Sequence, residues 1–346
     1  MKLLKVILQA LYFYFTKRNR KVDFVGQKVV YLDISSSYTR HLYCMLKCLN
    51  LSGYKICIRP RLKLLAELLG GSYTDLLFEE GAQVGKPVNY NELVVIDDSF
   101  LKREYYQTFL LEEPNPEIYH VPQTMHPLIY HLGKWDEPVE ESTRVKALVL
   151  LGNFDPVKYD NTLLKKIFKV ESRRGIYDLL IDKPYYKKVT SNEGFFEPDS
   201  EGKVMLVPTG DVSVGITEIR SHFSKFEFFF ALPGDKTPLC HNLIEAMSVG
   251  AIPFMEQPYA DLFDDPLEDG VNAIIYNGRE DMLNKIPEVL NMDNAQISKL
   301  RKGVEDYYKE HLTPQAIANK IVNKGYKRIY LQSGNKGLNP LYKLYQ

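Results

Sequence analysis

Apolar and polar positions recur along this chain with two spacings, and together they predict strands that alternate with helices. Lys28–Ile34 (KVVYLDI) is rich in β-branched residues and predicts a buried strand. Thr39–Leu51 has apolar residues at helical spacing, and Gly53 follows it as a stop. Tyr54–Ile58 predicts a second strand and Leu62–Leu69 a second helix. This order is typical of a parallel, doubly wound sheet.

The same alternation begins again after the acidic, polar linker Trp135–Thr143. Lys146–Leu151 predicts a strand that ends in Gly152-Asn153, and Phe226–Leu232 predicts a second one. Further helices are expected at Leu163–Val170, Ile216–Phe223, Met282–Leu290, Asn294–Glu310 and from Thr313 to about Asn323. We therefore predict an α/β protein with two Rossmann-like domains facing a cleft.

The predicted division has four parts. Residues 1–22 form a basic, apolar helix, and residues 23–140 form the first Rossmann-like domain. Residues 144–325 form the second one, and the basic, Tyr-rich tail 326–346 crosses back to the first domain. A length of 346 residues suits two domains of ordinary size.

Composition narrows the class of protein. Forty-four basic and 44 acidic residues cancel, so no overall positive charge recruits nucleic acid. Hydrophobic content of 45% and charged content of 25% are typical of a soluble globular protein. The cysteines lack the spacing of a zinc site and predict reduced core thiols: Cys44, Cys48, Cys57 and Cys240.

The first 22 residues combine a dense apolar run with lysine and arginine and contain no acidic residue. The run is too short to span a bilayer, which needs about 20 apolar residues, and no cleavage site follows it. Two interpretations remain open: a helix lying on an anionic membrane surface, or a helix packed on the first domain.

The most informative segment is Phe228–Tyr276. An apolar strand runs into Pro233-Gly234, and a polar loop leads to a helix with Thr237 as its expected N-cap and Pro238 at its first position. His241 and Glu245 lie four residues apart and share a face. A strand, a glycine loop and a helix N-terminus form an anion site suited to a nucleotide diphosphate.

These motifs resemble the donor half of GT-B glycosyltransferases, in particular the exostosin-like and fucosyltransferase-like branch, over roughly residues 215–325. The matching residues are Pro233-Gly234, Leu243–Met247, Gly250–Pro253 and Asp269–Asn272. The resemblance implies that Glu245 holds the nucleotide ribose and that Gly234–Thr237 hold the diphosphate. Many retaining members carry a second Glu eight residues earlier, where this chain has Thr237, and this departure favours an inverting mechanism.

The full set of expected donor-binding residues is Gly152, Asn153, Arg173, Arg174, Lys225, Pro233, Gly234, Asp235, Lys236, Thr237, His241, Asn242, Glu245 and Asn272. For the cations, the alternative is a solvated basic patch, and Lys225 precedes its strand as a plain surface residue would. For His241 and Glu245 the alternative is a local cap and an ion pair with a lysine.

Inverting transfer needs a base for the acceptor hydroxyl and positive charge or N–H dipoles for the leaving diphosphate. The base is expected at the carboxyl ends of the first domain's strands. The candidates are Asp33, then Asp98, and His126 in its proline-bounded segment. For each of them, an N-cap or turn role is the alternative. No Asp-x-Asp stands at a strand end of the second domain, so we expect no catalytic metal.

The sequence thus predicts a cytoplasmic glycosyltransferase, at most peripheral at the inner face of a membrane. It would move a sugar from a nucleotide-sugar donor to a glycan or lipid-linked acceptor in surface polysaccharide synthesis, by family analogy. The nucleotide sugar is a substrate, and no cofactor is expected. The alternatives are a non-catalytic module that binds a nucleotide or glycan, and a nucleotide-sugar epimerase.

Overall fold

The computed structural model describes residues 2–140, 142–160, 162–235, 237–323 and 325–345. The chain divides into two compact units. Unit 1 comprises Met1–His131 and His311–Asn339, and unit 2 comprises Leu132–Glu310 and Pro340–Gln346. Each unit contains a parallel sheet with helices around it, so the predicted α/β class and the two Rossmann-like domains are confirmed.

Unit 1 is built on a four-stranded parallel sheet in the order β4-β3-β2-β6. In its register Val30 of β2 lies between Ile56 and Val94 of the two neighbouring strands. Val29, Val30 and Leu32 are fully buried, as expected for a central parallel strand. The strands of this sheet are β2 (Lys28–Asp33), β3 (Tyr54–Ile58), β4 (Gln83–Val84) and β6 (Glu92–Asp97).

Two small parallel sheets complete unit 1. One pairs β1 (Lys21–Asp23) with β5 (Lys86–Val88). In the other, β14 (Arg328–Tyr330) lies between β7 (Leu101–Lys102) and β8 (Ile118–His120). The helices with residues in this unit are α1 (Lys2–Lys17), α2 (Arg40–Leu51), α3 (Leu62–Gly70), α4 (Leu76–Glu79), α5 (Tyr105–Leu111), α6 (Pro127–His131), α15 (Pro314–Val322) and the start of α16 (Asn335–Tyr345).

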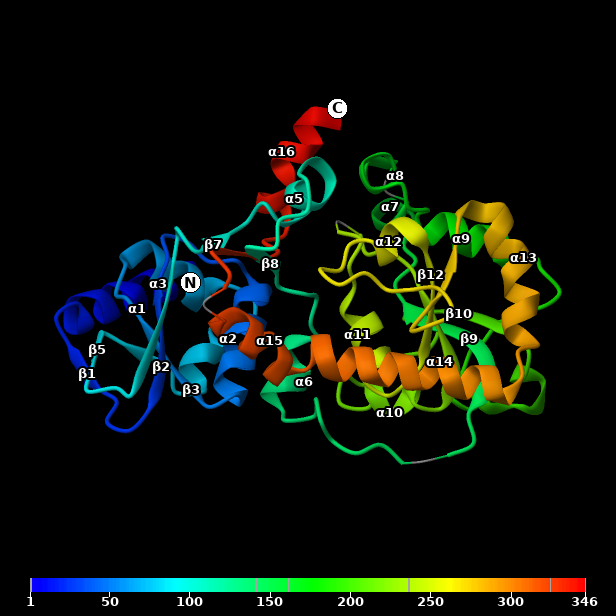
Figure 1. Ribbon diagram of the computed structural model, residues 1–346, viewed down its shortest axis with the longest axis horizontal. Coiled ribbons are helices and arrows are strands. Elements are labelled where there is room, and N and C mark those ends of the chain that lie inside the picture. The colour runs from blue at the N-terminus through cyan, green and yellow to red at the C-terminus, as the bar shows by residue number, and fades with distance from the viewer. Residues whose placement is uncertain (1, 141, 161, 236, 324, 346) are drawn as a thin grey trace. The chain divides into compact units, whose positions relative to one another are not determined.

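The helices of unit 1 pack through the apolar faces that their sequences present. The apolar residues that recur at helical spacing in α2 are fully buried: Leu42, Met45, Leu46 and Leu49. α1 lies against α3, as Figure 1 shows at the blue end of the chain. Ala10 and Leu65 are buried between these two helices, together with Val84 of β4. Among the described residues, no helix is long and apolar enough to span a bilayer.

Unit 2 has a five-stranded parallel sheet in the order β10-β9-β11-β12-β13. Its central strand β11 carries three consecutive buried phenylalanines, Phe228–Phe230, because both faces of the sheet are covered. The strands are β9 (Val145–Gly152), β10 (Val204–Pro208), β11 (Phe226–Ala231), β12 (Ile252–Glu256) and β13 (Ile274–Tyr276). The helices are α7 (Pro156–Tyr159), α8 (Thr162–Phe168), α9 (Arg173–Leu180), α10 (Ile219–Phe223), α11 (His241–Met247), α12 (Gln257–Ala260), α13 (Gly278–Leu290) and α14 (Asn294–Tyr307).

Two irregular segments complete the chain. Short 3₁₀ turns at Glu193–Phe196 and Pro198–Ser200 occupy the charged stretch before β10. A π-helical turn, Tyr308–Leu312, continues α14 towards α15.

The chain returns to unit 1 earlier than the sequence indicates. The predicted second domain extends to residue 325, whereas unit 1 already resumes at His311. α15 packs on α2, and its Ile317, Ala318 and Ile321 are buried there. Periodicity identified α15 as a helix but could not show which core it joins.

Candidate functional site

The carboxyl edge of the unit 2 sheet brings together two loops of the predicted donor site. β9 ends at Gly152 and β11 at Ala231, and these two strands are paired neighbours. The loop that begins with Asn153 therefore lies beside the loop that begins with Leu232. Ligands of open parallel sheets bind at this edge.

Arg173, at the start of α9, joins the two loops. Its Nε donates to the carbonyl oxygen of Pro233 at 3.1 Å and its Nη1 to that of Asn153 at 3.3 Å. Its Nη2 donates to the carbonyl oxygen of Leu232 at 3.4 Å and to Cys240 Sγ at 3.2 Å. The residue is only 4% exposed.

Among the described residues, no carboxylate pairs with the charge of Arg173. Ion pairs within the described residues include none to this guanidinium, although it also stacks over the Tyr159 ring at 4.7 Å. A buried cation without a counter-ion is costly, and an anionic ligand at the same place offsets that cost.

Two glycines allow this close packing. A Cβ on Gly152 would lie 2.7 Å from Arg173 Nη1, so any side chain there would displace the guanidinium. A Cβ on Gly234 would lie 2.6 Å from the carbonyl oxygen of Thr237. Gly234 N–H donates across this turn to the carbonyl oxygen of Pro238. Both glycines are thus required by contacts within the predicted site.

The helix after this loop begins later than predicted. α11 starts at His241, after Cys240, whose side chain makes no capping hydrogen bond. The expected N-cap Thr237 and first-turn Pro238 belong instead to the turn closed by Gly234. α11 therefore has seven residues, and its N-terminus does not lie at the glycine as expected. Lys236 lies outside the described residues.

His241 and Glu245 share one face of α11, as their spacing predicts. His241 Nδ1 and Glu245 Oε1 are 2.8 Å apart. The exposed fractions differ sharply, because the His241 side chain is 33% exposed and the Glu245 side chain 1%. A carboxylate with no exposed surface does not contact a ribose in this conformation. The outward-facing group is His241, and Glu245 orients its ring.

Two further side chains belong to this region. The amide oxygen of Asn242 is buried and has no hydrogen-bond partner within the part of the chain that the structure describes. Tyr342 of α16 was not expected at the site. Burial, and then the nearby Asp235 carboxylate, raise the pKa of Tyr342. Tyr342 lies 107 positions after Asp235 in the chain, so no local sequence pattern could predict that the two residues come close.

Arg174 occupies the neighbouring cavity. The cavity has a volume of about 270 Å³ at the ends of β9 and β10, and Asn153, Arg174 and Thr209 are part of its lining. Arg174 Nε donates to Asp178 Oδ2 at 2.8 Å, an i,i+4 pair on α9. Its hydrogen bonds with Asp178 raise the pKa of Arg174 further. Unlike Arg173, this arginine already has a carboxylate partner.

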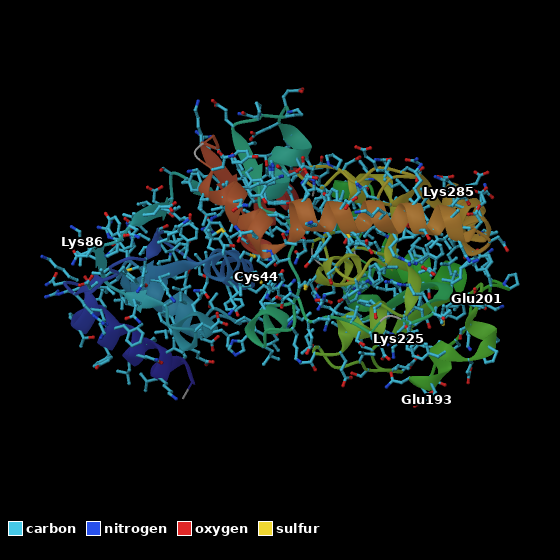
Figure 2. All side chains as sticks on the ribbon, turned by 60° about the horizontal axis from the view of Figure 1, so that its bottom comes forward. Cys44, Lys86, Glu193, Glu201, Lys225 and Lys285 are labelled. Atoms are coloured by element: carbon cyan, nitrogen blue, oxygen red, sulfur yellow. The ribbon has the colours of Figure 1, made fainter. Side chains whose placement is uncertain are left out.

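Two predicted donor residues lie at the other edge of the sheet. Lys225, labelled in Figure 2, directly precedes β11. Its Nζ lies over the Phe196 ring, 5.1 Å from the centroid. A strand of six residues separates it from the loops by roughly 20 Å. Asn272 precedes β13, and its Oδ1 accepts from the Glu268 N–H at 2.8 Å. Lys225 and Asn272 therefore do not join the loops of the predicted donor site. Both have local contacts at the amino edge of the sheet.

The candidate bases of unit 1 are all engaged in its structure. Asp33, at the end of β2, accepts from Arg61 Nε at 2.8 Å, and Arg59 bonds its other oxygen. Both carboxylate oxygens of Asp98 accept from Ser35 N–H, at 3.1 and 3.0 Å. These bonds fit the alternative of structural carboxylates.

His126 has a local partner as well. Its Nδ1 accepts from the Leu128 N–H at 3.3 Å at the start of α6, and its ring packs edge-to-face on Tyr73 at 5.1 Å. The proline-bounded segment becomes helical directly after His126, where α6 begins at Pro127.

The loop between β2 and α2 is held from several elements. Ser37 N–H donates to Glu67 Oε2 at 2.6 Å, and Arg103 Nη2 donates to Ser36 Oγ at 2.7 Å. Burial raises the pKa of Tyr38 to about 12, although Arg103 opposes the shift. Thr39 has φ of 58°, a strained value for a β-branched residue. Such strain is concentrated at functional sites.

Metal ligands are not grouped anywhere in the described part of the chain: no three His, Cys, Asp or Glu residues there could hold an ion together. The four cysteines are free thiols. Cys44, Cys48 and Cys57 are buried, as predicted, whereas Cys240 is only partly buried.

No family model and no curated protein matches this chain. Solved structures that resemble it include a glycosyltransferase from Rickettsia africae ESF-5, 8% identical over 86% of this chain and 99% of that chain, with a TM-score of 0.43. Anabaena Alr3699/HepE in complex with UDP is 10% identical over 85% of this chain and 98% of that one, with a TM-score of 0.36. Its complex with UDP-glucose has the same identity and TM-score. At these values no residue role is carried over to this chain.

Proposed function

We propose that this chain is a GT-B glycosyltransferase that binds a nucleotide sugar at the carboxyl edge of the unit 2 sheet. It transfers the sugar, with inversion and without a metal, to an acceptor bound by unit 1. Synthesis of a surface polysaccharide is the process we propose for it. The exostosin-like and fucosyltransferase-like branch is part of the proposal and rests on the sequence motifs alone.

The observation that carries the proposal is the guanidinium of Arg173. It is buried between Gly152-Asn153 and Pro233-Gly234, and no carboxylate in the described part of the chain neutralises it. A diphosphate beside these loops supplies the missing negative charge, and charge that builds up on the leaving diphosphate is stabilised in the same way. The short α11 adds less than the sequence suggests.

We propose the remaining contacts to the donor from the solvent exposure of the side chains near the two loops. His241 faces outward from α11 and is proposed to bind the nucleotide, with Glu245 as the residue that positions its ring. Asn153 and Arg174 line the adjoining cavity, which we propose holds another part of the donor.

A binding experiment tests the donor site. UDP and UDP-glucose, the ligands of the Anabaena HepE complexes, are the first compounds to titrate by calorimetry. Arg173→Met is expected to weaken UDP binding at least tenfold, the equivalent of about 1.4 kcal/mol. Lys225→Met is the matched control, because Lys225 lies at the other edge, and its affinity is expected to stay within twofold of the wild type.

The outcomes separate the alternatives. Equal loss in both variants would show that UDP does not bind at the Arg173 loops. Binding without turnover would favour a non-catalytic module, and conversion of the sugar without acceptor or released UDP would favour an epimerase. Full activity in EDTA is expected for a metal-independent enzyme, and an inverted anomer in the product is expected by NMR.

The catalytic base is proposed among Asp33, Asp98 and His126, to be tested by conservative variants. The base is identified by a loss of kcat of about 100-fold or more with unchanged UDP affinity. If Asp33→Asn keeps normal turnover, Asp33 is only the partner of Arg59 and Arg61.

We also propose that α1 contacts an anionic membrane surface. Although the helix packs on α3, its outer row remains exposed: Leu4 is 61%, Leu8 57% and Phe15 63% accessible. The residues from 2 to 22 include no acid, so this row faces a negative surface without repulsion. Flotation with phosphatidylglycerol vesicles tests the proposal, and absence of binding at low salt would contradict it.

A further inference from the structure

A groove runs between α1 and α3 on unit 1, separate from the outer row of α1. It has two adjoining parts, with volumes of about 690 and 430 Å³, and both are lined by Ile7, Lys63 and Ala66. The larger part also reaches Ser37 and Thr39 of the loop after β2. The groove therefore leads from apolar helix faces to the carboxyl edge of the unit 1 sheet.

The chemistry of the groove changes along its length. Leu3, Val6 and Ile7 contribute apolar walls from α1, and Ala66 does so from α3. The smaller part has only one polar side chain in its lining, Lys63. Hydroxyl groups are confined to the end at Ser37 and Thr39, where Glu67 is already bonded by Ser37 N–H.

Two charged side chains line the larger part of the groove: Lys63, which lines both parts, and Glu67, which accepts the Ser37 N–H. Lys63 is exposed and makes no ion pair with any residue that the structure describes. Arg59 and Arg61 lie just before it in the chain and share the single carboxylate of Asp33. α1 contributes no acidic residue to the other wall. A phosphate is therefore complementary to Lys63, where the two parts of the groove adjoin, and not to the end at Ser37 and Thr39, where Glu67 lies.

We propose that this groove binds the apolar chain of a phosphorylated lipid, with the phosphate at Lys63 and the attached acceptor group at Ser37 and Thr39. A polypeptide segment is disfavoured, because its backbone polar groups would lie against walls that offer no partners. A bilayer surface contacts the convex outer row and does not fill a groove between two helices.

The inference rests on the proposed function in one respect, since it makes the acceptor lipid-linked rather than a free glycan. The polar end of the groove is at the sheet edge where ligands of parallel sheets bind, which is where the acceptor hydroxyl has to be. The strained Thr39 belongs to this end.

The experiment uses farnesyl phosphate, a 15-carbon isoprenyl phosphate, below its micelle concentration and titrated into the full chain by calorimetry. We expect saturable one-to-one binding. Farnesol, which lacks the phosphate, is expected to bind about five- to tenfold more weakly, and inorganic phosphate is expected to show no saturable binding. Lys63→Gln should abolish the preference for farnesyl phosphate over farnesol.

Two variants on α1 form a matched pair. Ile7→Gln introduces a polar side chain into both parts of the groove and should weaken farnesyl phosphate binding about tenfold. Leu4→Gln makes a similar change on the outer row, outside both cavities, and should leave the affinity within twofold of the wild type. Ala66→Phe, which fills both parts, serves as a second variant with circular dichroism to confirm folding.

Vesicle flotation and UDP titration on the same preparations complete the test. Leu4→Gln should weaken flotation more than Ile7→Gln does, the reverse of the order for farnesyl phosphate. Equal effects of the two variants on farnesyl phosphate, or no binding by the wild type, would overturn the groove proposal even if UDP binds. If farnesyl phosphate binds but UDP does not, the groove stands as a lipid site and the transferase assignment fails.

Discussion

The two sheet edges treat their arginines differently. In unit 1, Arg59 and Arg61 are about half exposed and share the carboxylate of Asp33. In unit 2, Arg173 is buried and bonded to three backbone carbonyl oxygens instead. A guanidinium that already has a counter-ion mainly holds a loop, whereas the charge of Arg173 is not neutralised by a carboxylate of the described residues. That uncompensated charge distinguishes the proposed donor edge from the unit 1 edge.

The histidines repeat this contrast. His131 of unit 1 has Glu80 Oε1 at 2.7 Å from its Nδ1. His222 of unit 2 is buried among aromatic rings, including Phe195 at 4.6 Å, and its Nε2 has no partner among the described residues. Among its described residues, unit 2 thus has a buried cation without a counter-ion, Arg173, at the carboxyl edge of its sheet. It also has a buried imidazole nitrogen without a hydrogen bond, in His222, at the amino edge.

The largest effect is expected for Arg173→Met. The buried carbonyl oxygens of Leu232 and Pro233 and the part-buried one of Asn153 lose their donor. At about 1 kcal/mol or more each, the free energy of unfolding should fall by roughly 3 to 5 kcal/mol. Chemical denaturation measures this change. A loss of less than about 1 kcal/mol would mean that the carbonyls find other partners and that Arg173 does not organise the loops.

The next effect is a pH dependence due to His222. Burial, with Lys225 nearby, lowers its pKa from 6.5 to about 4 in the folded protein. As the pH falls, His222 is protonated in the unfolded chain before it is protonated in the folded protein, and this favours unfolding. The contribution of neutral His222 to the free energy of unfolding is therefore complete above pH 6.5 and is lost as the pH falls to about 4. The expected loss is about 3 kcal/mol.

The His222→Phe variant is the control for this pH dependence. Its unfolding free energy should fall less than that of the wild type between pH 6.5 and 4. Identical slopes for the two proteins in this range would show that His222 does not carry the effect.

The smallest effect is expected for Arg61→Gln in unit 1. Its side chain is 41% exposed and Arg59 still pairs with Asp33, so the unfolding free energy should change by only about 0.5 kcal/mol. UDP affinity should not change. A destabilisation similar to that of Arg173→Met would remove the distinction between the two edges.

The sequence predicts local structure well wherever one face of an element determines it. β3 has the predicted bounds, and α2 begins one residue later than expected and buries the expected face. The beginning of α11 could not be predicted. Thr237 and Pro238 are residue types that often start a helix, but here they belong to a turn closed by the hydrogen bond from Gly234 N–H to the Pro238 carbonyl oxygen.

The site was predictable as a region but not as a set of contacts. The motifs located the two loops, and Arg173 was correctly placed beside them. The burial of Glu245 and the pairing of Asp33 with Arg61 depend on packing between distant segments, which no local pattern encodes. Lys225 shows a different error: it precedes its strand in the sequence and so lies at the amino edge of the parallel sheet, whereas the predicted site is at the carboxyl edge.

One feature of the fold bears on how the protein is made. β14 lies between β7 and β8, so their sheet cannot form before residue 330 has been synthesised. Almost all of unit 2 is a continuous stretch that the ribosome completes earlier. Unit 2 can therefore finish folding while the amino-terminal unit, although translated first, still waits for its last strand.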